Sequence, residues 1–163
     1  MKRLLTCLLV VSATLVTRGQ DPKHDFTTSL GLDGGVYLSD ASLIHAGLRL
    51  DVDYHAEKNF SIYGSIGYKR LFTFHGDGSV GIATAYLGPR FYFSPRVFLG
   101  AGVGFAFVAG DGESAGAFSY HPHLGLLMHK VMLTLGYVGI TDSGVNAGFA
   151  DLGILVRLGK KAS

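Results

Sequence analysis

The chain from residue 25 to residue 158 alternates between apolar residues and small or polar residues with a period of two. The clearest run is VFLGAGVGFAF at 97–107, where every odd position is apolar and most even positions are glycine or alanine. Successive side chains of a β-strand point to opposite faces, so this alternation predicts a strand with one apolar face. The same pattern predicts eight strands, at residues 26–38, 43–54, 60–69, 81–93, 97–107, 118–128, 131–139 and 147–158.

The predicted strands and their connections differ in length in a regular way. The strands have about nine to thirteen residues, whereas soluble strands average about 5–6 and a tilted membrane-spanning strand needs about 9–11. Three connections are short, at 55–59, 94–96 and 129–130. Three are longer and rich in Gly, Asp and Ser, at 70–79, 109–117 and 140–146, and the one near 39–41 is brief. Alternating short and long connections are typical of transmembrane barrels. The pattern therefore predicts an all-β fold, an eight-stranded antiparallel up-and-down transmembrane β-barrel.

Composition decides which face of these strands points outward. Only 16% of the residues are charged, compared with about 25% in an average protein. That is too few to cover the outside of a soluble barrel, so we expect the apolar face to meet lipid and the small, polar face to line a narrow lumen. Aromatic residues gather at the predicted strand ends, as in interfacial belts: Tyr54, Phe60, Phe91 and Phe93 at one level, and Tyr68, Phe105, Phe107, Phe118 and Tyr137 at the other. The net charge of +2 gives no reason to expect a nucleic-acid partner.

The polar face carries ionic groups of both signs. With the N-terminus on the periplasmic side, one group falls in the middle and periplasmic part of the lumen: Arg49, Asp51, Asp53, Arg90 and Arg157. A second group falls in its outer half: His45, Lys69, His121, His123 and Asp151. An unpaired charge inside a barrel is costly, so we expect mutual pairing in a polar network that plugs the lumen.

Two prolines lie inside predicted strands. Pro89 and Pro122 cannot donate a ladder hydrogen bond, and a closed barrel has no free edge to accommodate them. We therefore expect a β-bulge at each position.

The first residues form a separate segment. Lys2 and Arg3 precede an uncharged, mostly apolar run from Leu4 to Thr17, which is too short for a spanning helix. This pattern is typical of a cleavable signal peptide, which we place at 1–19, followed by a barrel domain at 20–163. A retained anchor is the alternative. Cys7, the only cysteine, lies in this segment, so the mature chain has no disulfide.

Several stretches resemble the small eight-stranded outer-membrane barrels of Gram-negative bacteria, the OmpA/OmpX-like "porin family" barrel domain. They are AYLGPRFYF (85–93), YHPHLGL (120–126) and the closing DLGILVRL (151–158). The resemblance covers residues 25–158 and implies a monomer in the cell outer membrane, placed there by the barrel-insertion machinery, with the lipid bilayer as its partner and no cofactor. Members usually end on an aromatic residue that this machinery reads, where this chain has Leu158.

Two groups of residues are candidate sites for chemistry. His121 and His123 project to the same side of one strand and could bind a metal with His45, Asp33 or Asp151 as third ligand, although no spacing fixes that ligand, so we expect no metal. Ser119 and His121 also share a side, but the order is reversed relative to the His-x-Ser of lipid-A deacylase barrels and no carboxylate partner is apparent.

The acidic stretch at 109–117, with Asp111 and Glu113, lacks the spacing of a calcium loop, and we expect an external loop there. The sequence thus predicts a non-enzymatic barrel with a structural or adhesive role through its external loops, or at most a very narrow pore. The alternatives are a lipid-A acyl-modifying barrel enzyme and a soluble lipocalin-like carrier.

Overall fold

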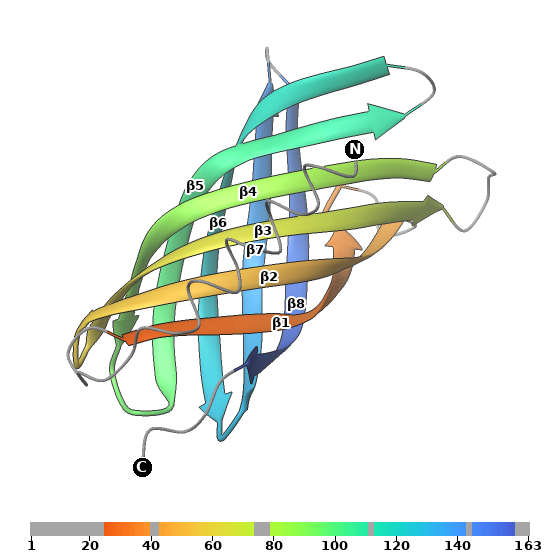
Figure 1. Ribbon diagram of the computed structural model, residues 1–163. Coiled ribbons are helices and arrows are strands. Elements are labelled where there is room, and N and C mark those ends of the chain that lie inside the picture. Colours follow the sequence, from red (N-terminus) through yellow and green to blue (C-terminus); the bar gives the residue numbers. More distant parts are fainter. Residues whose placement is uncertain (1–24, 40–42, 74–78, 111–112, 143–144, 159–163) are drawn as a thin grey trace, which may run out of the picture.

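The computed structural model describes residues 25–39, 43–73, 79–110, 113–142 and 145–158 (Figure 1). Eight strands follow one another along the chain: β1 (Asp25–Tyr37), β2 (Leu43–Glu57), β3 (Phe60–Thr73), β4 (Ser79–Tyr92), β5 (Val97–Gly110), β6 (Glu113–Met128), β7 (Val131–Asp142) and β8 (Val145–Leu158). Each strand pairs antiparallel with its sequence neighbours, and β1 pairs with β8, so the sheet closes. The predicted eight-stranded antiparallel barrel is confirmed. The predicted signal peptide lies outside the described residues.

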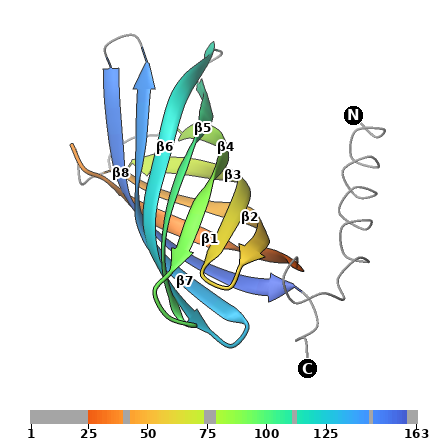
Figure 2. The same cartoon turned by 90° about the vertical axis from the view of Figure 1, so that its left-hand side faces the viewer.

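The strands run obliquely around the barrel (Figure 2). One end of the barrel, the tight-turn end, carries the turns β2–β3, β4–β5 and β6–β7 together with the start of β1 and the end of β8. The opposite end, the loop end, carries the other four connections. Within the described ranges, no helix is long and apolar enough to cross a bilayer.

The strands extend further toward the loop end than the sequence predicts. The segments 70–79, 109–117 and 140–146 were expected to be loops, but β3 to β8 continue into all three. Gly110 pairs with Glu113, and Asp142 pairs with Val145, so strand pairing reaches almost to the hairpin tips. Gly, Ser and Asp favour turns locally, yet a partner strand already in register overrides that preference. The expected loop at 109–117 is therefore mostly strand, and Glu113 begins β6.

The two prolines cause no bulge. Leu87 pairs with Val103 and Arg90 with Gly100 in one unbroken register, so Pro89 only interrupts the ladder toward β5. Pro122 likewise interrupts the ladder toward β7 without shifting it, because its other side stays paired with Ala101. The prediction of bulges is wrong. A proline on the outward face can interrupt the pairing with one neighbouring strand while the sheet keeps its register. Among the described strand pairs, the register shifts at His55/Glu57 in β2.

The two faces of the sheet separate as the alternation predicts. Large apolar side chains on the outward face are widely exposed, including Leu32, Leu48, Leu87, Leu135 and Ile154. The inward face fills the lumen, and its glycines make room for larger neighbours. Gly125 is one such position, because any Cβ there would collide with the ring of Phe98.

The lumen is packed in three layers. At the tight-turn end, Phe98, Met132 and Leu155 form a fully buried apolar layer. Toward the loop end, a second apolar layer consists of Ile82, Ala106, Ala117, Val138, Ile140 and Phe149. The polar side chains lie between these layers. Small and polar residues were expected throughout the lumen, and the two apolar layers were not predicted.

Candidate functional site in the barrel lumen

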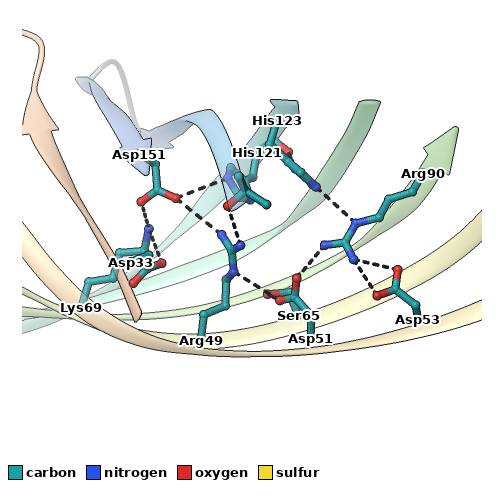
Figure 3. A network of polar contacts seen from close by, with 11 residues as sticks. Asp33, Arg49, Asp51, Asp53, Ser65, Lys69, Arg90, His121, His123 and Asp151 are labelled. Carbon is teal, nitrogen blue, oxygen red and sulfur yellow. Dashed lines mark hydrogen bonds and ion pairs between the residues drawn. The ribbon is translucent and has the colours of Figure 1, made fainter. Parts of the chain in front are cut away.

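The middle layer brings together charged side chains from five strands (Figure 3). All are at most 5% exposed: Asp33 of β1, Arg49, Asp51 and Asp53 of β2, Lys69 of β3, Arg90 of β4 and Asp151 of β8. They lie on the inward face because the alternation along each strand points them away from the side that carries its exposed apolar residues. Charges this deeply buried are stable only when they are paired.

Arg90 anchors the part of this layer nearest the tight-turn end. Its Nη1 donates to both carboxylate oxygens of Asp53, at 2.7 and 2.6 Å, and its Nη2 donates to Asp51 Oδ2 at 2.6 Å. The guanidinium also lies 4.0 Å from the ring centroid of Tyr63 and 5.1 Å from that of Phe98. Such short charge-assisted bonds are about twice as strong as neutral ones. Arg90 is therefore held by two carboxylates and an aromatic pocket at once.

Asp151 is the hub of the part nearest the loop end. Lys69 Nζ lies 2.6 Å from its Oδ1 and also 3.0 Å from Asp33 Oδ2, so one ammonium joins β1, β3 and β8. His45 Nε2 and His121 Nε2 lie 3.5 and 3.6 Å from the same Asp151 carboxylate. Basic side chains from β2, β3 and β6 thus converge on one acidic residue of β8.

Arg49 connects the two parts. Its Nε lies 3.3 Å from Asp51 Oδ1, its Nη1 lies 3.5 Å from Asp151 Oδ2, and its Nη2 donates to Thr134 Oγ1 at 2.8 Å. The charges therefore alternate in sign along a chain that we term the charge ladder: Asp53, Arg90, Asp51, Arg49, Asp151, Lys69, Asp33. Alternation gives every charge an opposite neighbour, which offsets the cost of desolvating it.

The two parts of the ladder differ in how completely they are bonded. Around Arg90, each carboxylate receives close donors, including Ser65 Oγ, which donates to Asp51 at 2.7 Å. Around Asp151, neither ring nitrogen of His45 nor of His121 has a hydrogen-bond partner among the described residues. A cavity of about 10 Å³, room for about one water molecule, lies beside His45, Lys69 and Thr84. The ladder is therefore tighter toward the tight-turn end.

Comparisons with known proteins address the fold. No family model matches the sequence, and no curated protein matches it. The solved structure of Ail, the attachment invasion locus protein of Yersinia pestis, is similar, with a TM-score of 0.63 and 18% identity, covering 82% of this chain and 97% of that chain. The N-terminal β-barrel domain of Pseudomonas aeruginosa OprF gives a TM-score of 0.57 and 10% identity, covering 81% of this chain and 97% of that one. The fold is that of the small eight-stranded outer-membrane barrels.

A third similar structure shows that this fold does not by itself imply a biological role. A de novo designed transmembrane β-barrel matches with a TM-score of 0.56 and 13% identity, covering 86% of this chain and all of that one. The same barrel thus forms in a chain with no natural history, so a role has to be argued from the residues of the site.

Most residues expected in the lumen network lie in or against the charge ladder. Arg49, Asp51, Asp53 and Arg90 belong to it, and three histidines contact it: His45, His121 and His123. Arg157 does not join it; it is half-buried near the end of β8, and its Nε has no hydrogen-bond partner among the described residues. Tyr63, whose ring lies against Arg90, was not singled out from the sequence, although the same alternation places it inward.

The histidine pair is arranged for packing and hydrogen bonding. The rings of His121 and His123 stack at 4.6 Å between centroids. His123 Nδ1 donates to the carbonyl oxygen of His121 at 3.1 Å, and its Nε2 accepts from Arg90 Nε at 3.3 Å. Both nitrogens of His123 are engaged, and the part of the chain that the structure describes holds no group of three or more His, Cys, Asp or Glu that could bind a metal.

Ser119 is likewise engaged elsewhere. Its hydroxyl donates to the carbonyl oxygen of Gly139 at 2.8 Å and accepts from the Tyr86 hydroxyl at 2.8 Å. The residue is fully buried, beneath the apolar layer at the loop end. A nucleophilic serine needs a base within hydrogen-bond reach and access to substrate. The geometry around Ser119 favours a structural hydroxyl.

Proposed function

We propose that this chain is an integral outer-membrane protein whose sealed barrel serves a structural or adhesive role, without an enzyme site. The observation that carries this proposal is the polarity of the barrel: buried charges occupy the middle of its interior, and apolar side chains cover its exterior. Leu32, Leu87 and Leu135 are each more than 60% exposed. Soluble monomers rarely expose contiguous apolar patches larger than a few hundred Å². An apolar belt around a closed sheet is suited to lipid, where a closed sheet satisfies every backbone polar group.

Aromatic contacts at two levels of the exterior support the membrane location. Near the tight-turn end, Phe26 lies 5.0 Å from Tyr54 and Phe60 lies 5.1 Å from Phe91, between ring centroids. Toward the loop end, the rings of Tyr120 and Tyr137 lie 5.8 Å apart. Aromatic girdles at two levels are characteristic of barrels that span a bilayer.

The filled lumen supports a sealed barrel over the alternatives. A carrier of the lipocalin type needs an interior cavity for its ligand and a polar exterior, and this barrel has a packed interior and an apolar exterior. A pore needs an open path, and the charge ladder lies between two apolar layers. The remaining surface for a partner is the loop end, where three hairpins extend. Ail, which shares the fold, is by name an attachment invasion protein, which accords with an adhesive role.

Heat-modifiable gel migration of isolated membrane fractions tests location and barrel together. We expect the mature protein in the outer-membrane fraction, migrating differently before and after boiling. Recovery of the mature protein in solution without detergent would contradict the membrane location.

Two further measurements separate the alternatives. In planar bilayers we expect no steady conductance, and stable open channels would contradict the sealed lumen. Lipid A from expressing cells should show unchanged acylation, with Ser119→Ala and His121→Ala as controls. A change in acylation that either substitution abolishes would establish the enzyme alternative instead.

A further inference from the structure

Each tight turn of the barrel carries one exposed basic side chain. Lys58 lies in the β2–β3 turn, Arg96 in the β4–β5 turn and Lys130 in the β6–β7 turn. Glu57 is the exposed acidic residue beside them. The three turns lie at the same end of the barrel, so their side chains form a ring of positive charge, the basic turn ring (Lys58, Arg96 and Lys130).

Along the sequence, acidic residues gather in and beside the segments that connect strands at the loop end: Asp40, Asp77, Asp111, Glu113 and Asp142. Arg70, a basic residue of β3, also lies near that end. The net charge of +2 alone does not indicate this difference in sequence between the two sets of connections.

The basic turn ring lies directly beside the apolar exterior. Phe93, in the same turn as Arg96, is 71% exposed, and Phe91 just before it is 51% exposed. Such aromatic side chains sit at headgroup level in a bilayer. A basic side chain three residues further along the turn therefore lies at the depth of the lipid phosphates.

Two of the three turns hold the backbone beside these side chains in a defined position. Ser94 Oγ accepts from the backbone N–H groups of Arg96 and Val97, at 3.2 and 3.1 Å, which closes the β4–β5 turn. The β6–β7 turn has only two residues, His129 and Lys130, between paired strands. Short, hydrogen-bonded turns lose little freedom when a ligand binds, which favours binding.

We propose that the basic turn ring binds the phosphate headgroups of anionic phospholipids in the leaflet that surrounds the tight-turn end. Each Lys or Arg near an anionic membrane surface favours the charged lipid about fivefold. Phosphate is the chemistry that Arg and Lys recognise best, through charge-assisted hydrogen bonds. Enrichment of anionic lipid at this end would fix the depth of the barrel in the bilayer.

Tryptophan quenching tests this directly, because the chain contains no tryptophan. Phe93→Trp places one reporter beside Arg96, and Phe107→Trp, at a position that is 60% exposed, places a matched reporter toward the loop end. Each variant is reconstituted in vesicles that contain brominated phosphatidylglycerol or brominated phosphatidylcholine. The ratio of quenching by the two lipids gives their relative association at each end.

At the Phe93→Trp reporter we expect the anionic lipid to associate about fivefold more strongly at low salt. The ratio should fall to about one when Lys58→Gln, Arg96→Gln and Lys130→Gln are combined, or when about 1 M salt shortens the Debye length to about 3 Å. At Phe107→Trp the ratio should be about one or lower. A ratio of one at residue 93, or equal enrichment at both ends, overturns the proposal.

The inference rests on the proposed membrane location, and the two failures look different. A barrel that does not insert leaves both reporters unquenched by either lipid, which contradicts the proposed function. Equal quenching by both lipids at residue 93 contradicts only the basic turn ring. Heat-modifiable migration confirms that each variant is folded, and the comparison of the two reporters needs no charge substitution.

Discussion

Arg90→Gln should destabilise the barrel more than almost any other single change in the lumen. The substitution removes the cation that lies within 2.7 Å of both Asp51 and Asp53. Asp51 keeps Arg49 at 3.3 Å as a partner, whereas among the described residues Asp53 keeps the Ser61 hydroxyl at 3.4 Å. Within the described part of the chain, Asp53 is then a fully buried carboxylate with no ion-pair partner.

The expected loss follows from these contacts. Removing one partner of a buried ion pair costs about 3–5 kcal/mol, and a desolvated cation–π contact such as that of Arg90 with Tyr63 adds about 2 kcal/mol. The total, roughly 5–7 kcal/mol, is comparable with the entire stability of many domains, about 5–15 kcal/mol. Arg90→Lys keeps the charge but loses the two-pronged geometry, so its loss should be intermediate.

Urea titration in detergent micelles, followed by the heat-modifiable gel shift, measures the free energy of unfolding. The decisive comparison is Arg90→Gln with and without Asp53→Asn. If the loss comes from an Asp53 carboxylate that has no counter-charge, Asp53→Asn should restore a large part of the free energy of unfolding that Arg90→Gln removes. A free energy for Arg90→Gln within about 1 kcal/mol of the wild type, or no recovery in the double variant, would refute the reasoning.

Three further changes can be measured with the same titration or gel. Gly125→Ala should lose about 1–3 kcal/mol because its methyl group meets the Phe98 ring, and Phe98→Leu should recover part of this; an unchanged midpoint would contradict the close packing. His129→Gly should gain about 1 kcal/mol, since His129 has a φ of 54°, and a loss would show that this turn is not strained. Leu158→Phe, at an outward position that is 49% exposed, should raise the fraction of protein that migrates as folded barrel in cell membranes, and an equal fraction would show that leucine serves as well at this position.

The strands and their faces could be predicted because one side of every strand differs chemically from the other. In β2, Arg49, Asp51 and Asp53 alternate with apolar residues, and a period of two admits only one assignment of faces. The same alternation placed the histidines of β6 inside. These predictions depend only on local sequence, and the structure places the residues on the predicted faces.

Contacts across the barrel could not be predicted in the same way. Lys69 and Asp151 are separated by 82 positions, and their contact depends on how all eight strands are staggered around the barrel. The strand ends near the loops were misjudged for a related reason. Residues 113–117 have the composition of a loop, but β5 provides a partner for each of them. Pairing between strands determines both the contacts across the barrel and the positions of the strand ends, and local composition carries no information about that pairing.

The charge ladder also bears on why the barrel adopts a single register. Buried ion pairs often contribute no more stability than apolar residues of similar size, so the ladder is weak evidence for stability alone. A lumen of apolar side chains, however, would leave both faces of each strand apolar, and a strand that slipped by one residue would lose little. With the ladder, a one-residue slip of β2 would turn Arg49, Asp51 and Asp53 toward lipid. An Arg side chain on the lipid face near the bilayer midplane costs about 2–4 kcal/mol, and an Asp side chain costs less. One Arg and two Asp costs in a single strand disfavour the slipped register, so the ladder specifies which face of each strand meets lipid.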